Sequence, residues 1–116
     1  MHINFTSIFV DDQDKALHFY TDVLGFEKKT EEQAGDFKWL TVVSREDPDG
    51  TQLVLEPNEN PVSRAYQRGI FEQGIPATSF GVTDIDQEYK RLKKAGVEFS
   101  MEPTEAEGPT VAVFDD

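Results

Sequence analysis

Hydrophobic and polar residues follow the same pattern twice along this chain. Residues 9–26 read as the end of a strand, an acidic helix cap, an amphipathic helix and a glycine stop. Asp11 or Asp12 can cap the free backbone N–H groups of the helix, and Gly25 stands where a left-handed C-terminal residue belongs. One apolar stripe with helical spacing is formed by Ala16, Phe19, Tyr20 and Val23. We therefore expect a helix of three to four turns here.

Residues 82–99 repeat this unit with one residue dropped. The acidic cap is Asp84, the glycine stop is Gly96, and the apolar stripe consists of Ile85, Tyr89 and Leu92. The repeat predicts two similar modules, so function should be sought between them.

The first module continues with strands. Apolar and β-branched residues predict strands over residues 2–10, 26–30, 37–43 and 51–56, and residues 31–36 are expected to form a polar loop. Asp47–Gly50 is a turn signal that makes the last two strands a hairpin. The first module is therefore predicted to be βαβββ.

Residues 57–76 join the modules, and two interpretations of this arm stay open. It is either a polar crossover loop or a short helix, with Val62, Tyr66 and Phe71 on one face, that packs on a neighbouring subunit. The second module is expected to begin with a strand over 77–83 and to end with strands over 97–101 and 110–114.

These elements predict one α+β domain over residues 1–116. It consists of module one (1–56), the connecting arm (57–76) and module two (77–116), and the two βαβββ modules form a cupped mixed sheet with helices on its outer face. Counted against its own repeat, module two lacks its last strand. The exposed strand edge would need cover from another chain, which predicts a homodimer.

Charge and composition narrow the possible partners. A formal net charge of −12 argues against nucleic acid and anionic membranes as partners, because both attract clustered Lys and Arg. No cysteine is present, which excludes zinc–thiolate sites and a cysteine nucleophile. With no signal peptide and no long apolar run, we expect a cytoplasmic location.

The duplicated unit resembles the vicinal oxygen chelate superfamily, which holds glyoxalase I, the bleomycin-resistance proteins and the extradiol dioxygenases. The match is carried by Val10-Asp-Asp, Ala16, Phe19-Tyr20, Val23-Leu-Gly-Phe26, Leu55-Glu56 and residues 82–96. The resemblance implies a curved sheet whose inner face holds a metal or a ligand, in a pocket that dimerisation often completes.

The resemblance also implies where metal ligands would stand. The first-strand positions fall on Phe5 and Ala77, which cannot bind a divalent cation, Glu56 matches a ligand position, and the fourth position lies beyond Asp116. A single carboxylate does not hold a transition metal. His2 and His18 are expected to be exposed histidines rather than ligands. We therefore expect no metal cofactor, with a divalent metal as the alternative.

Alternation along the strands predicts what lines the inner face. Leu53 and Leu55 should pack under a helix, which turns their neighbours toward the cup. The sequence does not fix the side of their strand to which Trp39 and Thr41 point. The predicted ligand-binding residues are Phe5, Ser7, Phe9, Trp39, Gln52, Val54, Glu56 and Ser79. These residues form an aromatic pocket with a few polar groups, as is usual for small-molecule sites.

Glu56 is the one candidate catalytic residue. Desolvation among aromatic rings would disfavour its charged form and suit a general acid or base; the alternative is a hydrated carboxylate, or one paired with an arginine such as Arg64. We interpret the chain as a metal-free protein that binds a small aromatic or amphipathic molecule, leaving open whether it is an enzyme. The alternatives are a metal-dependent lyase or dioxygenase completed by a partner subunit or by a missing C-terminal strand, and an assembly protein with a vestigial cup.

Overall fold

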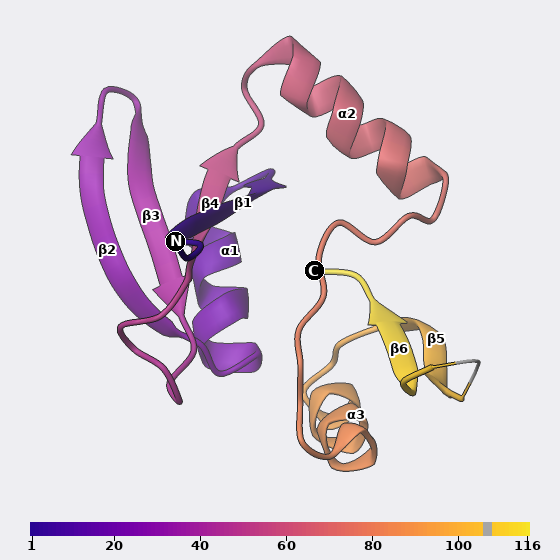
Figure 1. Cartoon of the computed structure of the whole chain (residues 1–116). Helices are drawn as coiled ribbons and strands as arrows, with labels where there is room; N and C mark the ends of the chain where they lie inside the picture. The colour runs from indigo at the N-terminus through magenta and orange to yellow at the C-terminus, as the bar shows by residue number, and fades with distance from the viewer. Residues whose placement is uncertain (106–107) are drawn as a thin grey trace. The chain divides into compact units, whose positions relative to one another are not determined.

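A four-stranded mixed sheet organises the first part of the chain, as the computed structural model shows for residues 1–105 and 108–116 (Figure 1). The strands lie in the order β1-β4-β3-β2, with β1 parallel to β4 and the other neighbours antiparallel. Their bounds are Phe5–Val10 (β1), Glu27–Ala34 (β2), Phe37–Val43 (β3) and Gln52–Pro57 (β4). With a helix between β1 and β2, this is the βαβββ order that the sequence predicts. The chain divides into two compact units, Met1–Ala77 and Thr78–Asp116.

One face of the sheet packs against the helix that follows β1. This helix is α1 (Gln13–His18), and it continues into a π-helical turn, η1 (Phe19–Val23). The residues that form the buried layer are Val10, Ala16, Tyr20, Leu40, Val42, Leu53 and Leu55. Because Leu53 and Leu55 lie in this layer, the alternate residues of β4 point to the other face.

The N-terminal cap and the glycine stop of this helix are as predicted, but its second half is not α-helical. Asp12 caps it by accepting hydrogen bonds from the backbone N–H groups of Asp14 (3.0 Å) and Lys15 (3.1 Å), and Gly25 has a φ of +95°. The prediction of a regular α-helix throughout was wrong. The N–H of Leu24 donates to the carbonyl of Phe19, five residues back, at 2.9 Å, which is the hydrogen bond of a π-helical turn. The spacing of apolar residues could not reveal the π-helical turn. Ala16 and Tyr20 are buried on the same side of the helix with this turn, as they would be in a regular α-helix.

The side chain of Gln13 joins α1 to the two central strands. The ladder between β3 and β4 consists of two residue pairs, Thr41↔Val54 and Val42↔Leu53. Beyond it, Gln13 Nε2 donates to the carbonyl oxygens of Lys38 (2.8 Å) and Leu55 (2.9 Å), and Gln13 Oε1 accepts from the N–H of Lys38 (3.1 Å). A side-chain amide therefore supplies backbone hydrogen bonds where the ladder has stopped.

The connecting arm contains a helix, α2 (Pro61–Glu72), rather than a loop throughout, and its packing on a neighbouring subunit stays a prediction. Asn60 caps it, with Pro61 at its first position. Its inner side is polar: Gln67 Nε2 donates to the carbonyl of Phe9 (3.0 Å), and Gln67 Oε1 accepts from the buried Asn58 (2.7 Å).

The prediction that α2 carries a single apolar face was wrong. Val62, Tyr66 and Phe71 are all exposed, at 78%, 59% and 67%. Val62 and Tyr66 are one turn apart, whereas Phe71 follows Val62 by nine residues, which is two and a half turns and therefore the opposite side of the helix. Two flanks, rather than one stripe, thus carry apolar side chains.

The second unit consists of a helix and a hairpin. They are α3 (Ile85–Lys94), β5 (Phe99–Thr104) and β6 (Val111–Phe114). Asp84 caps α3, and Gly96 has a φ of +95°, both as predicted. The ring of Phe99 lies 4.7 Å from that of Tyr89 and 5.6 Å from that of Phe114, between centroids, so an aromatic cluster joins the helix to the hairpin.

Two predicted segments differ from the structure. Residues 77–83 form no strand within the described chain, and neither β5 nor β6 pairs with that segment. Residues 31–36 are not a loop: β2 extends to Ala34 and turns through Gly35 at a φ of +66°. Pairing with β3 supplies the backbone hydrogen bonds that make this polar stretch a strand despite its composition.

Substitution of Gln13 tests the importance of its amide. Gln13→Ala removes three partly buried hydrogen bonds, so we expect the free energy of unfolding to fall by about 2–4 kcal/mol. Urea denaturation followed by circular dichroism measures this. The matched control is Gln73→Ala at an exposed position, which should change stability by less than about 0.5 kcal/mol. Equal losses in the two variants would contradict the role given to Gln13.

Candidate functional site

The sheet face opposite α1 carries most of the predicted ligand-binding residues. The parallel register of β1 and β4 pairs Phe5 with Gln52, Ser7 with Val54, and Phe9 with Glu56. Residues two apart on a strand share a face, and paired residues on neighbouring strands point the same way. These six side chains are therefore on one face.

Trp39 and Thr41 belong to the same face. The sequence had left open the side of the strand to which they point. The rings of Phe5 and Trp39 meet edge to face, with centroids 5.4 Å apart and an interplanar angle of 72°. Thr41 Oγ1 donates a hydrogen bond to Gln52 Oε1 at 2.7 Å. Both contacts require β3 to present its odd-numbered residues to this side.

The Phe5–Trp39 pair forms an aromatic cover over β4. Since β4 lies between β1 and β3 in the sheet, rings from these two strands can meet only by crossing over it. Beneath them Val54 is 2% exposed and Thr41 is fully buried, whereas Phe5 and Trp39 remain 48% and 39% exposed. The face thus offers partly exposed aromatic surface on a well-packed floor.

Three polar groups on this face have free hydrogen-bonding capacity. The amide nitrogen of Gln52, the hydroxyl of Ser7 and the carboxylate of Glu56 make no hydrogen bond or ion pair with any residue that the structure describes. Arg64 lies 3.4 Å from Glu59 and does not pair with Glu56, as one interpretation of the sequence had it. Donors and acceptors beside exposed rings are what a small-molecule site requires.

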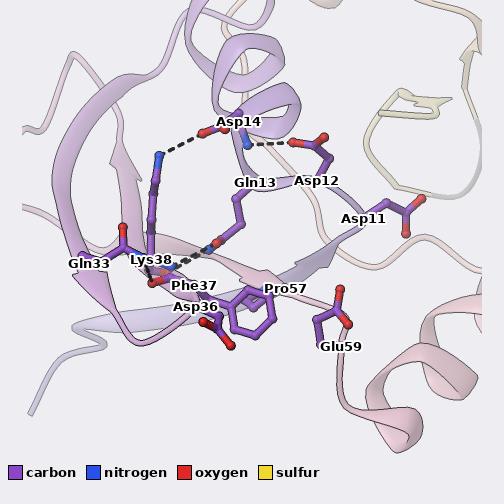
Figure 2. Close-up of a pocket in the computed structure, with 10 residues that line it drawn as sticks. All are labelled: Asp11, Asp12, Gln13, Asp14, Gln33, Asp36, Phe37, Lys38, Pro57 and Glu59. Atoms are coloured by element: carbon purple, nitrogen blue, oxygen red, sulfur yellow. Dashed lines mark hydrogen bonds and ion pairs between the residues drawn. The ribbon is translucent and has the colours of Figure 1, made fainter.

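A separate acidic pocket of about 240 Å³ lies at the start of α1 (Figure 2). Its lining residues are Asp11, Asp12, Gln13, Asp14, Gln33, Asp36, Phe37, Lys38, Pro57 and Glu59. None of the predicted ligand-binding residues is among them. The available signal was the acidic run Asp11-Asp12, which sequence reasoning took as a helix cap.

Comparisons with known proteins identify the family. Residues 2–116 match the model of the Glyoxalase/Bleomycin resistance protein/Dioxygenase superfamily. The chain belongs to this superfamily. It is 58% identical to the uncharacterized protein YurT of Bacillus subtilis (strain 168), over all of this chain and 91% of YurT.

Solved structures of the superfamily share the fold. The crystal structure of UcmS2 matches with a TM-score of 0.84 and 32% identity, over 98% of this chain and 89% of UcmS2. TnmS3, an antibiotic binding protein from Streptomyces sp. CB03234, matches with a TM-score of 0.75 and 26% identity, over all of this chain and 87% of TnmS3. The resemblance inferred from the sequence is therefore confirmed. No helix within residues 1–105 and 108–116 is long and apolar enough to cross a membrane.

The residues present do not fit the metal centre that the superfamily implies. Glu56 shares its face with Phe5, and within the described chain no three His, Cys, Asp or Glu side chains come together as a metal site. His2 is exposed, and His18 Nδ1 lies 2.6 Å from a carboxylate oxygen of Asp22 at the surface of the helix. We derive no metal-dependent step from this donor set.

Ser79 is the one predicted ligand-binding residue outside the first unit. It is exposed and lies in the segment that forms no strand. Its place in the ligand site of this superfamily member stays a prediction.

A small ion-pair network surrounds Lys38 beside the acidic pocket. Lys38 Nζ lies 2.9 Å from Asp14 and 3.3 Å from Glu31, and Lys28 Nζ lies 3.1 Å from Glu31. The hydrogen bond to Asp14, followed by that to Glu31, raises the pKa of Lys38 above its usual range. Hydrogen bonds from Lys28 and then Lys38 lower the pKa of the Glu31 carboxyl.

Titration of Glu31 tests this network. Its lowered pKa means that its pairing stabilises the fold above the pKa of the unfolded chain, and that this contribution disappears as the pH falls through the folded pKa. NMR titration of the side-chain carboxyl carbon should give a pKa below 4.5. Lys28→Met and Lys38→Met should each move it upward, and Lys90→Met on α3 should leave it unchanged. An unshifted Glu31 titration in both of the first two variants would contradict the assignment.

Proposed function

We propose that this protein binds a small aromatic or amphipathic molecule on the Phe5–Trp39 face without a metal ion. The observation that carries the proposal is the exposed edge-to-face ring pair over a buried floor, with the polar groups of Ser7, Gln52 and Glu56 unengaged beside it. A similar solved structure, TnmS3, is described as antibiotic binding, which agrees with a role in holding molecules.

The energetics of such a site suit aromatic ligands. Covering each 100 Å² of apolar surface contributes about 2.5 kcal/mol, and a well-oriented aromatic contact adds roughly 0.5–1.5 kcal/mol. Val54 and Thr41 are already packed, so the floor does not need to reorganise when a ring lies over it. The free polar groups would then fix the orientation of the ligand.

We also propose that the protein forms a homodimer. Val62 and Tyr66 lie one turn apart on α2 and are mostly exposed, although apolar side chains of this size are usually covered. In the sheet, β1 is an edge strand and has no strand neighbour on its outer side among the described residues. A second copy would bury these features, which supports the homodimer expected from the sequence.

Binding of an uncharged ring tests the proposed function. We expect 2-naphthalenemethanol to bind the purified protein, and Phe5→Ala to raise its Kd about tenfold, a loss of about 1.4 kcal/mol. Isothermal titration calorimetry measures both, with Phe71→Ala as a control that removes a ring exposed on the other flank of α2. Excess EDTA should leave the Kd unchanged. A Kd unaffected by Phe5→Ala, or binding abolished by EDTA, would contradict the proposal.

Sedimentation equilibrium tests the dimer. The wild-type protein should sediment at twice its monomer mass at micromolar concentration, and Tyr66→Glu should shift it to monomer by placing a charge on the apolar flank. Gln73→Glu adds the same charge beyond the end of α2 and should leave the dimer intact. Wild-type protein that is only monomeric would count against the proposal.

A further inference from the structure

We infer that the molecule bound at the Phe5–Trp39 face is a cation, an aromatic compound that carries an ammonium or similar basic group. This inference rests on the proposed function and specifies its ligand class. It follows from the distribution of charge over the two faces of the first sheet.

Carboxylates gather on the ligand face. Glu56 is directly opposite Phe9 in the register of β1 and β4. Because β3 and β4 are antiparallel, Trp39 and Glu56 each lie two residues from the Thr41↔Val54 pair, toward the same end of the sheet. Glu32 is paired with Trp39, and Glu27 with Val43, so β2 adds two more acids to this face. The aromatic surface is thus bordered by negative charge.

The lysines of the sheet lie on the helix-covered face or pair with groups away from the ligand face. Lys28 is paired with Val42, a residue of the helix-covered face, and Lys38 Nζ contacts Asp14 of α1 on that face. Lys29, at the bulge in β2, donates to the carbonyl of Pro48 (3.0 Å) and lies 3.4 Å from Asp49 in the turn. The four strands contain no arginine. No strand side chain on the ligand face therefore neutralises Glu56.

A cationic ring system would gain two interactions here that an uncharged ring lacks. Glu56 is half-buried and makes no ion pair within the described chain, so a bound ammonium would form a charge-assisted hydrogen bond with a partly desolvated carboxylate. The face of a tryptophan ring is also the most favourable aromatic surface for a cation. The net charge of −12 attracts cations at long range and repels anions.

Three probes with one ring system test the inference. They are 2-naphthylmethylamine, 2-naphthalenemethanol and 2-naphthoate, which are positive, neutral and negative at pH 7. Trp39 is the single tryptophan of the chain, so its indole N–H cross-peak in a nitrogen–proton correlation spectrum reports binding at this face directly. We expect the amine to bind about tenfold more tightly than the alcohol, and the carboxylate most weakly.

Substitution of Glu56 separates this site from the acidic pocket. Glu56→Gln should reduce the affinity for the amine to that for the alcohol. Glu59→Gln removes the same charge from the pocket of Figure 2 and should leave the preference for the amine intact. The same cross-peak, followed in each variant, supplies both results.

The outcomes distinguish the two proposals. Equal binding of amine and alcohol to the wild-type protein would overturn the cation preference and leave the binding function standing. A preference that survives Glu56→Gln, or that disappears in Glu59→Gln, would overturn the assignment to Glu56. No shift of the Trp39 cross-peak with any probe would overturn both proposals.

Discussion

The amide of Gln13 holds together the parts of the first unit on which its other features depend. It lies at the first position of α1 and bonds to the backbone of Lys38 and Leu55, where the β3–β4 ladder has stopped. The residues that follow these two are Trp39 and Glu56. One side chain on the helical face thus sets the backbone position of an aromatic and an acidic residue on the opposite face. A hydrocarbon at position 13 could not do this, because only an amide both donates to carbonyl oxygens and accepts from an N–H.

The two faces of this sheet carry different kinds of side chain because they meet different physical requirements. The helix-covered face needs apolar volume, which Leu40, Val42, Leu53 and Leu55 supply, and its charges lie at the rim in the Lys38 network. The other face is not covered by α1. It retains partly exposed rings and unpaired polar groups, features that would cost stability in a core and that suit a surface made for a ligand.

Membership of the superfamily establishes the scaffold and leaves the chemistry to individual side chains. At the position where metal-using relatives are expected to place a ligand, this chain has Phe5, and that ring pairs with Trp39. A phenylalanine at this position supplies no metal donor and contributes aromatic surface instead. Glu56, which would have been one ligand among several, stands without an ion-pair partner in the described chain. The proposed binding role and the acidic character of this face thus depend on the same strand positions.

The sequence by itself determined the family, the βαβββ order of the first unit, the helix caps and glycine stops, and the side of β4 that faces away from α1. These features depend on local rules: capping at Asp12 and Asp84, positive φ at Gly25 and Gly96, and alternation along a strand. Only the tertiary structure decided the side to which Trp39 points, the π-helical turn, the polar inner side of α2 and the bridging by Gln13. Each of these depends on contacts between residues far apart in the chain, which local periodicity does not encode. The predicted strand at residues 77–83 was wrong for the same reason, because a strand exists only where a neighbour completes its hydrogen bonds.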